Sequence, residues 1–212
     1  MKIYHISKLS GQDTDFRPTM LSALVAAQAY KKNNGNDVVN VYIASGFFDS
    51  VSSCQLTSKN STNLYQALQG LDKIYLIGAY SGYSDELSLA RQLKNSNQPN
   101  VYVYYKWRSH AKIFVITINE KPVFEIIGSS NMTYPAYCGK TKQNKPSPNV
   151  ECDLILFDEQ MINVVIEPSP QIMQFRYFSE DNNEVPLISK MNDIMSILET
   201  QIALSNDITD KI

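Results

Sequence analysis

The stretch VYVYYKWRSHAKIFVITINEKPVFEIIGSSN, residues 101–131, decides the fold that this 212-residue chain is expected to adopt. Its alternating β-branched and aromatic residues predict a strand that contains His110 and Lys112, whose side chains would lie on one face, about 6.6 Å apart. A turn at residues 119–122 and a second apolar strand then lead to a small-residue turn at residues 128–131. The stretch therefore predicts two neighbouring strands that bring a histidine, a lysine and a glycine-serine turn together.

These residue types suit the binding and cleavage of a phosphate ester. Gly128 and the small residues after it let backbone N–H groups approach an anion. His110 is able to act as a nucleophile toward phosphorus or as a base, provided that a partner fixes the tautomer of its ring and donors hold the phosphate oxygens. We expect these donors to come from Lys112, Ser129 and Asn131. The chemistry requires no metal ion or other cofactor.

A carboxylate is expected to complete the site. Glu151 lies near the start of an apolar run, residues 149–157, that predicts a further strand. Two interpretations of Glu151 fit the sequence equally well: a glutamate at a strand edge that faces water, and a glutamate that orients the His110 imidazole. Glu120 and Glu125 fall in the turn and in the second strand, and we expect both to face solvent.

Substrate contacts are predicted from basic and small residues near these positions: Lys106, Arg108, Ser130, Lys140 and Lys142. For the last two, in a loop rich in Lys, Pro and Asn, a solvated turn is an equally good interpretation. The net charge of −2 and the pI near 5.7 argue against a protein that binds nucleic acid through a global basic surface. A site for a polyanion must therefore be local.

Strands that alternate with helices predict an α/β architecture with an at least partly parallel sheet. We expect one domain, residues 1–212, with a core of about residues 1–160 and a C-terminal helical extension, residues 161–212, that packs on the core or forms a subunit contact. Residues 2–6 are interpreted as an edge strand. The three cysteines, odd in number, and the absence of a long apolar run predict a soluble cytoplasmic protein with reduced thiols.

At this point the sequence resembles a known family. His110-Ala111-Lys112, followed by the turn at residues 128–131, resembles the HxK…GSxN signature of the phospholipase D superfamily. Together with IASGFF at residues 43–48 and Asn149-Val150-Glu151, the chain is most similar to the single-motif nuclease branch, in particular the NgoFVII-type and BfiI-type restriction endonuclease catalytic domains. The resemblance covers roughly the first 160 residues.

The resemblance implies a fold and a mechanism. The fold is a phospholipase D-like α–β–α sandwich with a central mixed, largely parallel β-sheet, and the active site forms between the two chains of a homodimer. One His110 would attack the scissile phosphodiester of DNA, and His110 of the partner subunit would protonate the leaving oxygen, without a divalent cation. Lys112 and Asn131 would bind the phosphoryl oxygens, and Glu151 would orient the histidine. The aspartate of the superfamily signature would fall at Thr117 and is absent.

Three functions follow from these expectations. The first is a DNA endonuclease of a restriction or defence system, or its catalytic domain. The second is a phospholipase-type phosphodiesterase, although we expect no membrane partner. The third is a catalytically silent DNA-binding or assembly subunit. A separate DNA-recognition domain or subunit is left open as a further partner.

Overall fold

The structure, a computed structural model, describes residues 2–8, 16–46, 48, 64–78, 84–95, 100–132, 136, 150–166, 172–175 and 185–212. The strands are β1 Lys2–Lys8, β2 Val39–Ser45, β3 Lys73–Gly78, β4 Val101–Tyr105, β5 Lys112–Ile118, β6 Lys121–Gly128, β7 Glu151–Phe157, β8 Ile172–Phe175 and β9 Asn206–Asp207. The helices are α1 Phe16–Asn33, α2 Leu64–Leu68, α3 Ser84–Asn95, α5 Val185–Ala203 and the short 3₁₀ helix η2 Thr209–Lys211.

Within the described ranges the strands form one mixed sheet in the order β8-β1-β7-β6-β5-β2-β3-β4-β9. Only the pairs β2–β3 and β3–β4 are parallel, and the other neighbours are antiparallel. The expectation of a largely parallel sheet is therefore wrong, because helices connect only the strands of the first half of the sequence. The interpretation of residues 2–6 as an edge strand is also wrong, since β1 lies between β7 and β8.

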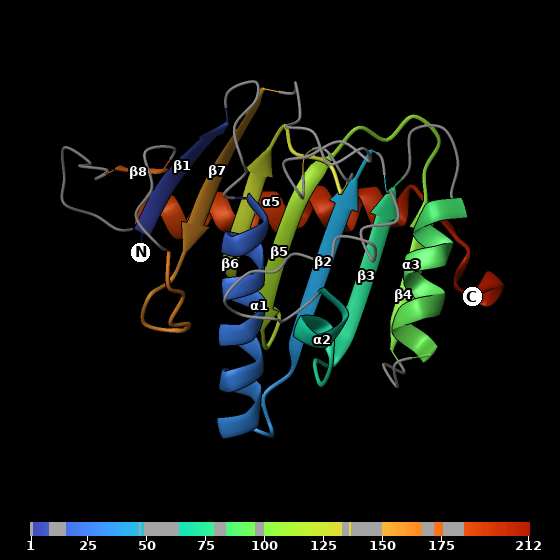
Figure 1. Cartoon of the computed structure of the whole chain (residues 1–212), viewed down its shortest axis with the longest axis horizontal. Helices are drawn as coiled ribbons and strands as arrows, with labels where there is room; N and C mark the ends of the chain where they lie inside the picture. The colour runs from blue at the N-terminus through green and yellow to red at the C-terminus, as the bar shows by residue number, and fades with distance from the viewer. Residues whose placement is uncertain are drawn as a thin grey trace.

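Helices cover both faces of the sheet (Figure 1), so the α–β–α layering expected from the sequence is confirmed. Helices α1, α2 and α3 lie on one face, where the larger core cluster joins them to the strands. Helix α5 crosses the opposite face, where Met195 and Leu198 pack with Val115 of β5 in a second buried cluster. None of the helices in these ranges is both long enough and apolar enough to cross a lipid bilayer.

The pattern of apolar residues explains both layers. In α1, Met20, Leu24 and Ala27 recur at helical spacing and are fully buried against the sheet. Burying a leucine such as Leu24 contributes roughly 2 kcal/mol to stability. Strand β2, VNVYIAS, is buried along nearly its whole length, as expected for a strand in the middle of a sheet covered on both faces.

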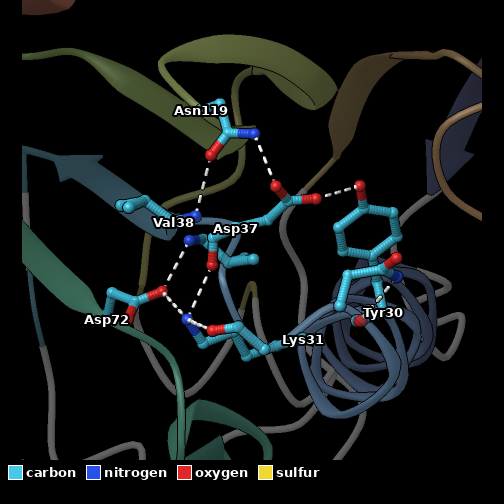
Figure 2. A network of polar contacts seen from close by, with 9 residues as sticks. Tyr30, Lys31, Asp37, Val38, Asp72 and Asn119 are labelled. Atoms are coloured by element: carbon cyan, nitrogen blue, oxygen red, sulfur yellow. Dashed lines mark hydrogen bonds and ion pairs between the residues drawn. The ribbon is translucent and has the colours of Figure 1, made fainter.

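A polar network ties the ends of several elements together at the edge where β2 begins (Figure 2). Asp37 accepts hydrogen bonds from Tyr30 Oη at 2.6 Å and from Asn119 Nδ2 at 2.9 Å, and these two bonds hold the pKa of Asp37 below its ordinary value. Lys31 Nζ lies 2.9 Å from Asp72 Oδ2. Because Asn119 belongs to the β5–β6 turn, the network fixes that hairpin against α1, at the end of β5 that lies opposite to Lys112.

Candidate active site

The candidate site lies at one end of four central strands of the sheet, where β2 and β6 end and β5 and β7 begin. Ser45, the last residue of β2, lies opposite Lys112, the first residue of β5. Gly128, the last residue of β6, lies opposite Asp153 of β7. Lys112 shares a sheet face with the buried Phe114, which belongs to the core cluster on the α1 side. Because neighbouring strands among β2, β5, β6 and β7 run antiparallel, two strand ends and two strand starts meet at the same end of the sheet.

His110 does not lie in a strand, so the expectation of one strand through His110 and Lys112 is wrong. The stretch is divided into β4, which ends at Tyr105, and β5, which begins at Lys112. A turn closes between them, with a 3.0 Å hydrogen bond from Ser109 N to the carbonyl of Lys106. The polypeptide must turn here because β4 and β5 are not neighbours: β3 and β2 lie between them.

His110 and Lys112 are nonetheless brought together. Lys112 Nζ lies 2.9 Å from His110 Nδ1 and donates a hydrogen bond to the His110 carbonyl at 2.8 Å. The imidazole is exposed, and it lies against Gly46, where a Cβ atom would come within 3.2 Å of His110 Cα and Cδ2. Partial burial lowers the pKa of Lys112 from its ordinary value, and the charge of Glu151 acts in the opposite direction.

Glu151 is 7% exposed, so the interpretation that it faces water is wrong. Its Oε2 atom accepts a 2.6 Å hydrogen bond from Ser129 Oγ, and the same hydroxyl accepts a 2.9 Å bond from Cys152 N. Ser129 thus connects the end of β6 to the start of β7. The role of Glu151 in orienting His110 stays a prediction. The electrostatic effect of Glu151 on Lys112 couples the Ser129–Glu151 pair to the Lys112–His110 pair.

A second serine–carboxylate pair lies beside the first, and the sequence analysis missed its acid. Ser130 donates to Asp153 through its backbone N at 3.1 Å and through its hydroxyl at 2.5 Å. Burial raises the pKa of Asp153, the nearby charge of Glu151 adds to this increase, and the bonds from Ser130 oppose it. The signal for Asp153 was its spacing of two from Glu151 in a strand, which places both carboxylates on one face.

Asn131 is held by a residue that the sequence analysis also missed. Ser45 Oγ donates to Asn131 Oδ1 at 3.5 Å and accepts a 3.0 Å hydrogen bond from Met132 N. The signal for Ser45 was its position as a serine at the end of the buried apolar strand β2, similar to the position of Ser129 directly after β6. This contact places the Asn131 amide group beside the end of β2, and its role as a donor to a bound anion stays a prediction.

The remaining predicted residues have varied positions. Lys106 and Arg108 lie in the turn that precedes His110, with the Arg108 side chain exposed, and Lys140 and Lys142 fall outside the described residues. Whether these four residues contact a substrate stays a prediction.

Two further expectations concerned acidic side chains, and one of them fails. Glu120 is exposed, as expected. Glu125 was expected to face solvent and is instead fully buried in β6, where burial raises its pKa to about 9. The reason is that α5 packs over this face of β6, a contact between residues far apart in sequence.

Gly128 permits the close approach of β6 to β7 on which both serine–carboxylate pairs depend. A Cβ atom at this position would lie 2.3 Å from the Cys152 carbonyl oxygen and 2.6 Å from Asp153 Cα. We expect Gly128→Ala to lower the free energy of unfolding by about 1–3 kcal/mol, because the backbone must move to relieve this overlap. Urea titration would measure the loss. Gly35→Ala is the matched control, since a Cβ atom there meets nothing within 4 Å, and equal stability of the two variants would contradict the prediction.

Comparisons with known proteins give the following likenesses. No family model and no curated protein matches the sequence. Among solved structures, the chain is similar to NucT from Helicobacter pylori, at 11% identity over 97% of this chain and 99% of that one, with a TM-score of 0.45. It is also similar to yeast tyrosyl-DNA phosphodiesterase, at 11% identity over 76% of this chain and 49% of that one, with a TM-score of 0.42. A third likeness is to polyphosphate kinase from Porphyromonas gingivalis, at 11% identity over 92% of this chain and 28% of that one, with a TM-score of 0.40. All three TM-scores lie below 0.5, so the function proposed for this chain rests on the contacts of its own residues.

Proposed function

We propose that this chain is a phosphodiesterase of the phospholipase D type that cleaves DNA through His110 and needs no metal ion. One observation carries the proposal: an exposed imidazole whose Nδ1 atom lies 2.9 Å from a lysine ammonium group, at an end of the sheet that also holds a partly buried serine–glutamate pair. A histidine beside a fixed cation supplies a nucleophile for phosphorus together with a charge that attracts the phosphate.

The contact between Lys112 and His110 also bears on the protonation of the ring. A charged ammonium group only donates, so Nδ1 accepts its hydrogen bond and the proton of the neutral imidazole resides on Nε2. A nucleophilic His110 requires the proton on Nδ1, so that the Nε2 lone pair can attack, and a general acid requires the imidazolium, with a proton on each ring nitrogen. Both forms would arise when an anionic phosphate draws Lys112 Nζ away from Nδ1 to its own oxygens.

The reaction that we propose uses one histidine in each form, contributed by two copies of the chain. Nε2 of His110 forms a bond to phosphorus as the bond from phosphorus to the leaving oxygen breaks, and His110 of the partner subunit gives its proton to that oxygen. Water then attacks the phosphohistidine, losing a proton to the partner subunit's His110, and the P–N bond breaks. The products are a phosphate monoester and an alcohol, and each subunit returns to its starting form.

The surrounding residues are assigned to the charge that develops in this reaction. Lys112 and the Asn131 amide hold the non-bridging oxygens, where negative charge increases in the transition state. Ser129 holds Glu151 through a hydrogen bond near Lys112. The charge of Glu151 favours the ammonium form of Lys112 that phosphate binding requires. A role in a restriction or defence system, with DNA as substrate, a homodimer as the active form and the cytoplasm as location, belongs to the same proposal.

Independence of metal ions is the direct test. We expect purified protein to cleave plasmid DNA and bis(p-nitrophenyl) phosphate at rates that agree within about twofold in excess EDTA and in Mg²⁺, because Lys112 supplies the positive charge that a metal ion would otherwise provide. Acid-labile and base-stable ³²P on the protein after rapid quenching would identify the phosphohistidine. Cleavage that appears only when Mg²⁺ is added would show that the mechanism is wrong.

A further inference from the structure

The turn before His110 exposes the one tryptophan of the chain. Trp107 is 59% exposed, the largest aromatic side chain on the described surface, and it lies between Lys106 and Arg108. An exposed indole retains a large apolar face in contact with water, whereas tryptophan is usually largely buried. Its position in the sequence, between two cations and three residues before the proposed nucleophile, is consistent with a role in substrate binding.

The backbone fixes the position of this turn. Lys106 N donates to the carbonyl of Gly78, the last residue of β3, at 2.7 Å, and Ser109 N donates to the carbonyl of Lys106 at 3.0 Å. Arg108 has a φ of 59°, in the left-handed region that non-glycine residues rarely occupy. Ser109 is buried, and its carbonyl oxygen would lie 3.2 Å from a Cβ atom placed on Gly46.

The short chain between Trp107 and His110 limits the distance between the two residues. Three residues of extended chain span at most about 11 Å, so the Cα atoms of Trp107 and His110 lie within about 11 Å of each other, and both side chains are exposed. Strained backbone held by surrounding contacts is characteristic of functional sites, and here the strained residue directly follows the exposed ring. The turn therefore presents an exposed aromatic side chain on a backbone that is held close to that of His110.

We propose that Trp107 is a stacking platform for a nucleobase next to the phosphate held at His110, and that the substrate is single-stranded or locally unpaired DNA. This inference rests on the proposed function and names its substrate class. Only an unpaired base exposes a face on which an indole can stack, and such stacking is tolerant of sequence. Lys106 and Arg108, on either side of the ring, would contact the phosphates that flank this base.

The charge of the protein favours stacking over binding by a long basic groove. With a net charge of −2, the chain lacks the global positive field that holds double-stranded DNA through many phosphate contacts. A small number of local cations combined with one aromatic platform is instead typical of single-strand binding. We therefore infer that stacking on Trp107 supplies a part of the affinity for DNA that contacts with the phosphates alone do not supply.

The single tryptophan provides the measurement, because all indole emission comes from Trp107. Titration of full-length His110→Ala protein with an octathymidylate is expected to quench this emission, with a dissociation constant about 5- to 150-fold lower than for an abasic octamer with the same phosphates. A blunt hairpin duplex of equal charge is expected to bind as weakly as the abasic strand. Equal affinities for the octathymidylate and the abasic strand would overturn the proposal, and so would a preference for the duplex. An emission that changes with protein concentration and not with DNA would overturn it too, by placing Trp107 in a contact between subunits.

Cleavage separates this inference from the function on which it rests. Bis(p-nitrophenyl) phosphate has no nucleobase, so the ratio of kcat/KM for the octathymidylate to kcat/KM for this diester isolates the contribution of base stacking. We expect Trp107→Ala to lower the ratio about 5- to 150-fold and Trp107→Phe to restore much of it, because phenylalanine also stacks. Leu204→Ala, which removes another exposed apolar side chain, is the control. A wild-type enzyme that hydrolyses neither substrate contradicts the proposed function, whereas an unchanged ratio in Trp107→Ala contradicts the stacking role alone.

Discussion

Replacement of His110 by alanine is expected to lower the rate of phosphodiester hydrolysis by about 10⁴-fold or more. The variant loses the atom that we propose attacks phosphorus, and in the proposed dimer it also loses the group that protonates the leaving oxygen. Removing one member of a nucleophilic catalytic set typically costs this much, because the remaining residues only bind and polarise the substrate. Steady-state hydrolysis of bis(p-nitrophenyl) phosphate measures the loss, and circular dichroism establishes that the fold persists, since the exposed His110 ring is not part of the buried core.

The chain provides its own matched control in the second histidine. His5 lies in β1, with Nε2 2.8 Å from Cys152 Sγ, and His5→Ala is expected to retain hydrolysis within a fewfold of the wild type. A variant lacking His110 that keeps a tenth of the wild-type rate would exclude this residue as the nucleophile. Mixtures of wild type and His110→Ala, unfolded and refolded together, distinguish the dimer from a self-sufficient chain. Activity should follow the square of the wild-type fraction if two copies of His110 share each site, and the fraction itself if they do not.

The stability of the protein is expected to decrease as the pH rises through the neutral range, because of Glu125. Its carboxyl group is fully buried, lies across from Val115 and Leu156 on the neighbouring strands, and has no hydrogen-bond partner for either oxygen among the described residues. Burial raises its pKa from 4.5 to about 9. Between these two values the folded protein keeps a proton that the unfolded chain releases. The free energy of unfolding therefore falls by about 1.4 kcal/mol for each pH unit, or about 3 kcal/mol from pH 4.5 to pH 7.

Glu125→Gln removes this dependence while keeping the size of the side chain. We expect the variant to match the wild type near pH 4 and to exceed its free energy of unfolding by about 3 kcal/mol at pH 7, as measured by urea titration across the range. Glu120→Gln is the control, because Glu120 is exposed in the same hairpin. Glu86, buried at the start of α3 with a pKa raised to about 8, adds a slope of the same sign that both variants retain. A constant difference between Glu125→Gln and the wild type over pH 4–8 would contradict the prediction.

Local patterns were sufficient to predict most helices and strands. Helix α1 and strand β2 coincide with segments whose apolar periodicity and stop signals indicate a helix and a buried strand, because these signals are properties of neighbouring residues. The β5–β6 hairpin was likewise predictable from its turn, where Asn119 and Glu120 adopt positive φ values. What failed was the division between β4 and β5. The turn between them contains neither glycine nor proline, and a long-range hydrogen bond to the Gly78 carbonyl fixes its start.

The candidate site was predictable in its central residues and not in its supporting ones. His110 and Lys112 could be identified from two residue types at a spacing of two, and Ser129 and Asn131 from the turn that contains them. Ser45 and Asp153 could not, because their importance lies in contacts across strands whose antiparallel order the sequence pattern did not reveal. Glu125 failed for a related reason, since the helix that covers it begins sixty residues later in the chain.

The place of β1 in the sheet determines the order in which this protein is assembled. Within the described ranges β1 pairs with β7 and β8 alone, and Lys8 lies opposite Glu151. In the nascent chain β1 therefore lacks these two neighbours until about 150 further residues have been synthesised, and closure of so long a loop is slow. Glu151 reaches its position in that same late event, so a nascent chain acquires the complete candidate site only when β1 and β7 meet. Partly made chains would consequently expose β1 to other molecules before the candidate site is complete.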